Sequence, residues 1–150
     1  MSSKTDVIKM WHQESWKNPP SSVISANEKY FSDDFQSLDI DGNFRGDKAG
    51  MNATAQHIYN AFSGFKGVLH DVQEEADGSV TMTFHFEGTH SDDLDLSAMG
   101  MGVIPASGKS FVTPKSKSKF YVEDGQIVSS QPISGGFEYI LAELGAVPSD

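Results

Sequence analysis

Val80-Thr81-Met82-Thr83-Phe84-His85-Phe86 alternates apolar and polar residues, and this alternation is the clearest structural signal in the sequence. Successive side chains of a strand point to opposite faces of a sheet, so the pattern predicts a strand with one buried face. Ala76-Asp77-Gly78, which precedes it, is typical of a turn, and Val68 to Glu75 before that turn predicts a second strand. The sequence is therefore expected to contain an antiparallel hairpin with one apolar face.

Two more strands are expected on the C-terminal side of this hairpin, from Lys109 to Val122 and from Gln126 to Ile133. Glu123-Asp124-Gly125 joins them and is typical of a turn. A closing helix is expected from Phe137 to Leu144, because its apolar residues recur at helical spacing and Gly145 follows them.

The N-terminal side of the hairpin is mostly helical in pattern. Apolar residues at helical spacing predict helices over Asp6 to Lys17 and over Ser22 to Phe31, followed by a short extended piece from Phe35 to Ile40. The longest helix is expected to start at Asp47, because Asp is a favoured N-cap residue.

This helix is expected to end at Gly64 and Gly67, where the strands begin. Helices followed by antiparallel strands and a closing helix predict one α+β domain over residues 1–150. In this domain a curved antiparallel sheet wraps around three N-terminal helices, and a short C-terminal helix completes the fold.

Composition restricts the expected partners of the chain. Its 150 residues include 11 Lys and Arg against 21 Asp and Glu, which gives a formal net charge of −10. Nucleic acids and anionic membranes call for a dense basic surface, so neither is an expected partner. The absence of Cys excludes disulfides, thiolate metal sites and cysteine nucleophiles. The N-terminal residues lack the apolar core of a signal peptide, and no apolar run could span a membrane, so a cytoplasmic location is expected.

Four short motifs occur in order along the chain: Tyr30-Phe31-Ser32-Asp33-Asp34-Phe35, Gly88-Thr89-His90, Val122-Glu123-Asp124-Gly125-Gln126-Ile127-Val128 and Leu144-Gly145. Together they resemble the SnoaL-like polyketide cyclases, within the nuclear-transport-factor-2-like, or ketosteroid-isomerase-like, superfamily. The resemblance covers nearly the whole chain, from Val7 to Gly145. It implies a cone in which a bent sheet and three helices enclose an apolar pocket, and a homodimer formed through the convex side of the sheet.

The cyclase residues of this family do not carry over to the chain. Members that cyclise polyketide esters use an Asp on the last strand as general acid and base, supported by a His on the neighbouring strand. Counting from the shared Asp-Gly turn places the Asp position at Pro132 and the His position at Ser118. A Pro cannot transfer a proton, and Ser118 without a neighbouring base is only a hydrogen-bond partner.

The ketosteroid isomerase pattern is matched in part. Its general base is an Asp a few residues after the Phe-x-Asp-Asp motif, and a Tyr on the first helix and a protonated Asp hold the oxyanion. Counting from Phe31-Ser32-Asp33-Asp34 places the base at Asp39, the Tyr position near Trp11 and the second donor at Ser118. Partial burial of Asp39 would raise its pKa toward that of a working base.

The alternative interpretation of Asp39 is structural. Asp39 and Asp41 precede Gly42, and Asp residues in such a position often form a turn by binding nearby backbone amides. The sequence leaves both interpretations open.

By resemblance, a mixture of aromatic and polar side chains is expected to line the pocket. The expected residues are Trp11, Tyr30, Phe62, Phe84, Phe86, His90, Ser118, Phe120 and Ser130.

The five His show no spacing typical of a metal site, so no metal or cofactor is expected. His85 shares a strand face with Thr81 and Thr83 and is expected to point to solvent or to a dimer interface. His90 lies at a strand end, where it is either a solvated loop residue or a ligand contact at the pocket mouth.

Three functions are consistent with these observations. The first is a SnoaL-like polyketide cyclase or isomerase that acts by acid–base chemistry on a small apolar carbonyl compound, with Asp39 as base and Trp11 and Ser118 orienting the substrate. The second is a non-catalytic module that binds a small apolar molecule, because Ser116, Ser118 and Ser130 can bind a ligand without transferring protons. The third is a dimerisation domain whose pocket is closed by Phe84, Phe86, Phe120 and Trp11, which the ten Phe of the 150-residue chain make conceivable.

Overall fold

The computed structural model describes residues 3–19, 21–95, 102–135 and 137–144, and it shows helices packed against a strongly curved sheet. The helices are α1 (Lys4–Ser15), α2 (Ser21–Tyr30), α3 (Lys48–Ala61) and α4 (Phe137–Glu143). Asp47 caps α3 as predicted, because its side chain accepts a hydrogen bond from the Gly50 amide at 2.8 Å. None of the helices in these ranges is both long and apolar enough to cross a membrane.

The main sheet has the strand order β2-β1-β9-β8-β4-β3, with β7 paired to β4 as well. Its strands are β1 (Phe31–Leu38), β2 (Phe44–Asp47), β3 (Phe62–Glu74), β4 (Val80–His90), β7 (Ser110–Val112), β8 (Ser116–Glu123) and β9 (Gln126–Ser134). A separate small ribbon pairs β5 (Leu94–Asp95) with β6 (Val103–Ile104). The sheet is antiparallel except where β1 lies parallel to β9.

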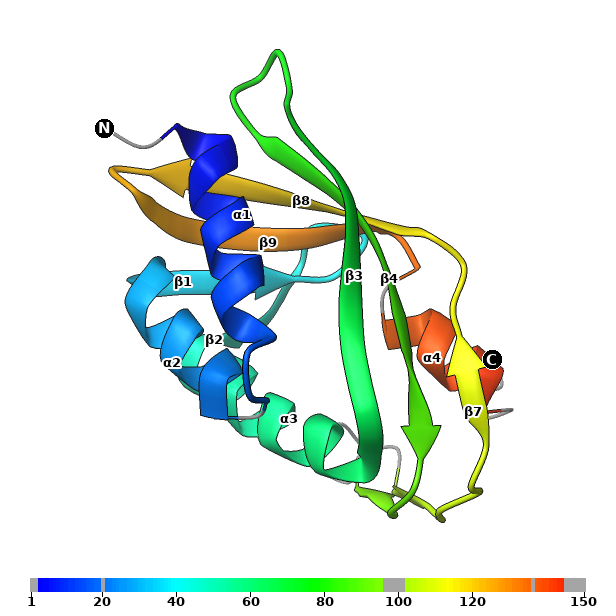
Figure 1. The fold of residues 1–150 in the computed structure, drawn as a ribbon. Coiled ribbons are helices and arrows are strands. Elements are labelled where there is room, and N and C mark those ends of the chain that lie inside the picture. The colour runs from blue at the N-terminus through cyan, green and yellow to red at the C-terminus, as the bar shows by residue number, and fades with distance from the viewer. Residues whose placement is uncertain (1–2, 20, 96–101, 136, 145–150) are drawn as a thin grey trace.

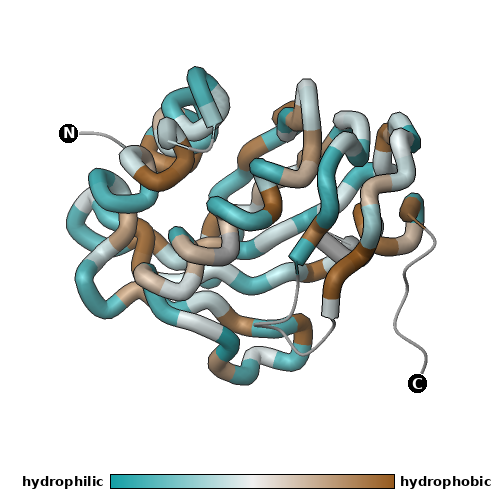
Figure 2. The backbone as a smooth tube through the Cα atoms, turned by 90° about the horizontal axis from the view of Figure 1, so that it is seen from below, coloured by the Kyte–Doolittle hydropathy of each residue, from teal (hydrophilic) through white to brown (hydrophobic). Residues whose placement is uncertain are grey.

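The arrangement is the predicted α+β cone. Figure 1 shows α1, α2 and α3 gathered on the inner side of the curved sheet, with the long strands β3 and β4 forming one wall. Figure 2 shows apolar and polar positions alternating along the strands, with hydrophilic residues prominent on the outer turns. The curvature leaves a hollow between the helices and the sheet.

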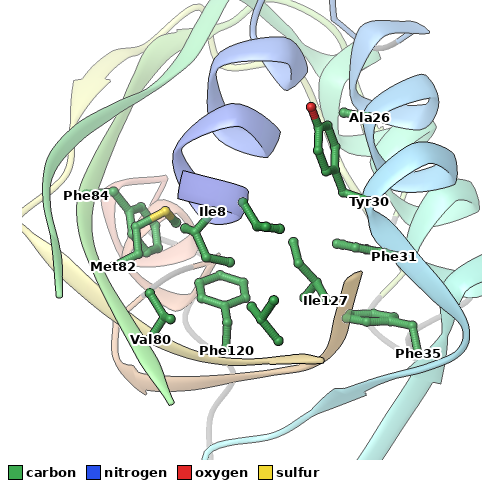
Figure 3. Close-up of a cluster of buried hydrophobic side chains, with 12 residues drawn as sticks. Ile8, Ala26, Tyr30, Phe31, Phe35, Val80, Met82, Phe84, Phe120 and Ile127 are labelled. Carbon is green, nitrogen blue, oxygen red and sulfur yellow. The ribbon is translucent and has the colours of Figure 1, made fainter. Parts of the chain in front are cut away.

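The alternating stretch quoted above forms β4, and its predicted buried face is confirmed. Val80, Met82 and Phe84 are buried, while Thr81 and Thr83 between them are partly exposed. These inner residues join a core made by α1, α2, β1, β8 and β9, in which the side chains point toward one another (Figure 3). Its buried members are Val7, Ile8, Ala26, Tyr30, Phe31, Phe35, Val80, Met82, Phe84, Phe120, Val122 and Ile127.

A second core lies where the end of α3 meets the start of β3 and the end of β4. Its buried residues come from α3, β3, β5, β7 and α4: Ala61, Phe62, Leu94, Phe111, Ile140 and Leu141. This core attaches α4 to the rest of the fold.

Two expected boundaries were wrong, for physical reasons. The helix α3 ends at Ala61 and β3 begins at Phe62, because pairing with β4 extends the strand through Gly64 and Gly67. The expected strand from Lys109 to Val122 is two strands, β7 and β8, separated around Pro114, which lacks the backbone N–H that a ladder needs.

Smaller differences affect the ends of other elements. The first strand begins at Phe31 and ends at Leu38, earlier than the expected Phe35 to Ile40. Gly145 of the last motif lies outside the described residues.

We expect Phe35→Ala to lower the free energy of unfolding by about 3–5 kcal/mol, because a large buried ring leaves a cavity when removed. Phe35 is 1 % exposed and its ring stacks on Phe31 at a centroid distance of 3.9 Å. Urea denaturation followed by circular dichroism measures the change. Phe44→Ala on neighbouring β2 is the control, since Phe44 is 63 % exposed and should change the value by less than about 0.5 kcal/mol. Equal effects of the two substitutions would show that the stack does not stabilise the core.

Candidate functional site

A cavity of about 830 Å³ lies between the helices and the inner face of the sheet. This volume suits a small organic molecule of several rings. Its walls come from α1 to α4 and from strands β1, β3, β4, β8 and β9, with apolar side chains predominating. They include Trp11, His12, Ser15, Trp16, Asn27, Ser37, Asp39, Arg45, Met51, Ile58, Tyr59, Phe65, Gly67, Met82, Phe84, Phe86, Ser118, Phe120, Ser130, Gln131, Pro132, Ile140 and Leu141.

The structure brings most of the sequence-derived pocket residues together. Trp11, Phe84, Phe86, Ser118, Phe120 and Ser130 all line the cavity, as does Asp39. Pro132 lines it as well and lies directly opposite Ser118 in the β8–β9 register. The two residues that the sequence resemblance placed at the cyclase Asp and His positions thus line the same cavity, and neither residue can transfer a proton by itself.

Three expected pocket residues lie elsewhere. Tyr30 is buried in the first core and its hydroxyl donates a hydrogen bond to Glu14. Phe62 belongs to the second core, where its ring contacts Phe111 at a centroid distance of 5.4 Å. The sequence pattern indicated that these side chains would be buried. It did not indicate whether they would line a cavity or pack within a core.

His90 also lies away from the cavity, and it is not a solvated loop residue. It is fully buried, with Nδ1 3.1 Å from the Ser107 hydroxyl and its ring against Phe62. Its Nε2 has no hydrogen-bond partner among the residues that the structure describes.

Asp39 lines the cavity from the β1–β2 turn, but its carboxylate binds the turn itself. Its Oδ1 accepts hydrogen bonds from the amides of Asp41 and Asn43, each at 2.9 Å. The hydrogen bond from the Asn43 amide is the main cause that holds the pKa of Asp39 below its usual value, and Arg45 contributes to the same effect. A lowered pKa weakens a carboxylate as a base, so the geometry favours the turn interpretation.

Trp11 has a structural partner of its own. Its indole Nε1 donates to the Asn27 side-chain oxygen at 2.9 Å, and Asn27 in turn donates to Asn52 at 3.0 Å. This chain joins α1, α2 and α3 beside the cavity, so Trp11 acts first as a wall residue. Its N–H is engaged by the Asn27 side chain.

His12 is one of the lining residues that the sequence analysis did not assign to the pocket, together with Trp16, Tyr59 and Phe65. It lies in the last turn of α1, lines the cavity, and its Nε2 is buried without a hydrogen-bond partner in the described part of the chain. Burial lowers the pKa of His12, so the imidazole is neutral at physiological pH. The only sequence signal that His12 would line the cavity was its position next to Trp11, which was an expected pocket residue. A single His on a helix belongs to no recognisable motif.

One end of the cavity is lined by a cluster of aromatic side chains. The Trp16 ring lies 5.2 Å from that of Tyr59 and 5.6 Å from that of Phe65, and Phe65 stacks against Phe86 at 5.4 Å. Gly67 makes this packing possible, because an added Cβ there would lie 2.8 Å from the Trp16 ring. Burial raises the pKa of Tyr59, so its hydroxyl stays protonated.

The remaining His show no metal site. No group of three or more His, Asp or Glu side chains within the described ranges is arranged to hold a metal ion. His85 lies on the outer face of β4, as expected from the alternation. Its Nδ1 is 2.7 Å from His70 Nε2, and its Nε2 is 2.9 Å from the Glu87 carboxylate oxygen Oε2.

Solved structures with similar folds support the predicted architecture. The chain aligns with a protein of Jannaschia sp. CCS1 named as a candidate SnoaL-like polyketide cyclase, with a TM-score of 0.70 and 16% identity, over 94% of this chain and 88% of that one. A candidate polyketide cyclase of Acidithiobacillus ferrooxidans aligns with a TM-score of 0.67 and 19% identity, over 97% and 98% of the two chains.

A third structure carries a ligand. It is a protein of Catenulispora acidiphila with a ketosteroid isomerase-like fold, in complex with trimethylamine, and it aligns with a TM-score of 0.64 and 13% identity, over 98% of this chain and 96% of that one. No family model and no curated protein matches the chain. The structural likenesses show that the chain has the SnoaL-like, ketosteroid-isomerase-like fold, as its motifs predicted.

We expect the free energy of unfolding to fall as the pH is lowered from about 7.5 to about 5. The folded-state pKa of His12 is lowered, so the unfolded chain takes up a proton that the folded chain resists. The contribution of His12 to the free energy of unfolding is therefore fully present above the pKa of His12 in the unfolded chain, and it declines as the pH falls below that value. His70, whose pKa is also lowered, acts in the same direction.

Urea denaturation across this range measures the decline, and His12→Phe should make it shallower. His57→Phe is the control, because His57 is exposed on α3 and lies outside the cavity. A decline that is equally steep with and without His12 would contradict the assignment.

Proposed function

We propose that this chain binds a small, largely apolar carbonyl compound in its cavity and converts it as a SnoaL-like cyclase or isomerase. The observation that carries the proposal is the cavity of about 830 Å³, whose walls are mainly apolar and also carry polar side chains. The likeness to structures named as candidate polyketide cyclases supports the same class of compound. The size of the cavity speaks against a dimerisation domain with a filled pocket.

Such a cavity suits proton transfer next to a carbonyl group. Removing a proton from the adjacent carbon places negative charge on the carbonyl oxygen, and a hydrogen-bond donor in a dry pocket stabilises that charge more than water does. The reaction then requires one group that accepts the proton and returns it to the product. No cofactor is needed for this chemistry.

Asp39, Asp41 and His12 are the Asp and His residues that line the described cavity, and because Asp41 is exposed we consider Asp39 and His12 for the proton transfer. The Asp39 carboxylate is bound to turn amides and has a lowered pKa, which makes it the weaker base. His12 lines the cavity as a neutral imidazole, and its Nε2 is buried without a hydrogen-bond partner in the described part of the chain. We therefore propose His12 as the proton-transfer group and Asp39 as a residue that fixes the β1–β2 turn beside the cavity.

Binding without turnover is the second candidate function. It is favoured by the resemblance, which places the cyclase Asp and His positions at Pro132 and Ser118, and by the fact that both residues line the cavity. A protein with this arrangement would hold the same apolar compounds and release them unchanged.

We expect an apolar compound to be found with the purified protein by native mass spectrometry. Adding it at about 100 times its Kd should stabilise the fold by about 2.7 kcal/mol, measured by thermal unfolding. With that compound as substrate, His12→Phe should abolish turnover, whereas Asp39→Asn should retain most of it because an Asn oxygen can still accept the turn hydrogen bonds.

The three possible results separate the candidates. Loss of turnover in Asp39→Asn alone would make Asp39 the base. Binding without any turnover in the unmodified protein would establish the binding module. Failure of every apolar compound tested to bind would contradict both functions.

We also propose that the chain forms a homodimer through the outer face of the sheet. This face carries Thr81, Thr83 and His85 on β4, and Tyr121 on β8 is 36 % exposed there.

We expect light scattering after gel filtration to give about twice the 16.3 kDa of one chain. Thr83→Arg should reduce the mass to that of a monomer by placing an unpaired charge in the interface, whereas Gln56→Arg on exposed α3 should not. A monomeric unmodified protein would contradict this arrangement.

A further inference from the structure

We infer that His70, His85 and Glu87 form a proton-operated switch on the outer face of the sheet, in which acid breaks the hydrogen bond between the two imidazoles and separates the two copies of the homodimer. The name switch is used below for these three residues. Its hydrogen bonds depend only on the geometry of β3 and β4. Its effect on assembly rests on the proposed homodimer, because it requires that the outer face bind a second copy.

The three side chains of the switch are joined in a row. His85 lies in the middle, with its Nδ1 2.7 Å from His70 Nε2 and its Nε2 2.9 Å from the Glu87 carboxylate. Lys66 holds Glu87 from the other side at 3.1 Å. Only 15 % of the His85 side chain is exposed, so its hydrogen bonds within the row replace those that water would otherwise make.

The switch lies at an irregularity in the pairing of β3 with β4. The register shifts between Leu69 and Asp71, so that His70 has no residue paired with it on β4. An extra residue of this kind interrupts the backbone ladder locally. The hydrogen bond between His70 and His85 therefore spans the two strands at a point where their backbone pairing is interrupted.

The carboxylate determines where the protons lie. The hydrogen bond from His85, followed by that from Lys66, lowers the pKa of Glu87, so Glu87 only accepts and His85 Nε2 must donate to it. When both imidazoles are neutral, His85 Nδ1 accepts a hydrogen bond from His70 Nε2. When His85 gains a proton, its Nδ1 donates to His70 Nε2 instead. The hydrogen bond between the imidazoles is kept in both states, which are the closed forms of the switch.

A second proton breaks this hydrogen bond. When both imidazoles are cations, all four ring nitrogens carry hydrogens. The N–H of His70 Nε2 and the N–H of His85 Nδ1 would then point at each other across 2.7 Å, and two positive charges would lie side by side. The two rings must separate, and this is the open form of the switch.

The groups around His70 oppose the second proton. Loss of hydration is the first cause that lowers the pKa of His70, and the charges of Lys115 and His85 add to it, whereas the adjacent Asp71 does not contribute. Lys117 on β8 is a further exposed cation on the same face. Because the pKa of His70 is lowered in the closed form, that form is fully favoured above the ordinary pKa of His, about 6.5, and becomes less favoured as the pH falls below it.

Opening changes the charge of the proposed interface. His85 lies on the same outer face as Thr81 and Thr83, through which the homodimer is proposed to form. A two-fold interface presents the same residues from both copies, so each copy brings two added positive charges to it. Like charges that meet across an interface oppose binding. Acid is therefore expected to shift the homodimer toward monomers.

NMR spectroscopy of nitrogen-15-labelled protein tests the hydrogen bond of the switch. A scalar coupling between His70 Nε2 and His85 Nδ1, transmitted through their shared hydrogen, is expected at about pH 7.5 and should vanish at about pH 5. His70 and His85 should titrate in two steps more than about one pH unit apart, whereas the exposed His57 should titrate in one step. Absence of the coupling at about pH 7.5, or its persistence after both imidazoles have titrated, would overturn the switch.

Light scattering after gel filtration tests the effect on assembly. The unmodified protein should change from a dimer at about pH 7.5 to a monomer at about pH 5, with circular dichroism checking that the fold is intact at both values. His70→Gln should remain a dimer at about pH 5, because Gln is similar in length, hydrogen-bonds His85 and gains no charge. His57→Gln on α3 is the matched control and should dissociate as the unmodified protein does.

The two measurements fail separately. A dimer that persists at about pH 5 after the coupling has vanished would overturn the control of assembly, as would dissociation of His70→Gln at the same pH as the unmodified protein. A monomer at both pH values would contradict the proposed homodimer, and the effect on assembly would fail with it. The scalar coupling would still decide whether the two imidazoles form the switch.

Discussion

The inner face of β4 carries Val80, Met82 and Phe84, and these side chains leave water only if other elements cover them. The sheet bends and α1 packs across it, so that the apolar face of β4 and that of β8 close on the helices. Complete closure would give a solid core. Here the two cores lie at separate places, one under α1 and β1 and the other under α3 and α4, and the space between them remains as the cavity.

Much of the fold could be predicted from local pattern, and much of the site could not. The period of two in β4 and the cap at Asp47 depend on neighbouring residues, and both were confirmed. The parallel pairing of β1 with β9 joins residues about a hundred positions apart, and no local pattern encodes it. The extension of β3 through Gly64 and Gly67 likewise follows from its partner strand, which outweighs the weak strand propensity of glycine.

The site residues also divide into those that local sequence could place and those whose surroundings depend on distant elements. Ser118, Phe120 and Ser130 lie on strands whose faces alternate, so their inward direction could be inferred once the strands were placed. Tyr30, Phe62 and His90 are equally inward-facing, but whether an inward residue meets a cavity or a packed core depends on distant elements. His12 was missed for a related reason: its direction depends on how α1 rotates against the sheet, and the helix sequence alone does not determine that angle. The turn role of Asp39 was one of two interpretations, and the backbone hydrogen bonds at its carboxylate favour it.

Gly67 has a consequence for how a chain of this fold can change over time. The Trp16 indole lies against the backbone at a point where any Cβ would collide with it, so the depth of the cavity at that end depends on the absence of one methyl group. A single-nucleotide change from glycine to alanine would displace the indole and alter the length of the chamber, while the strand pairing of β3 with β4 could remain as it is. The shape of the cavity can therefore change through one residue of β3 while the fold that encloses it stays the same.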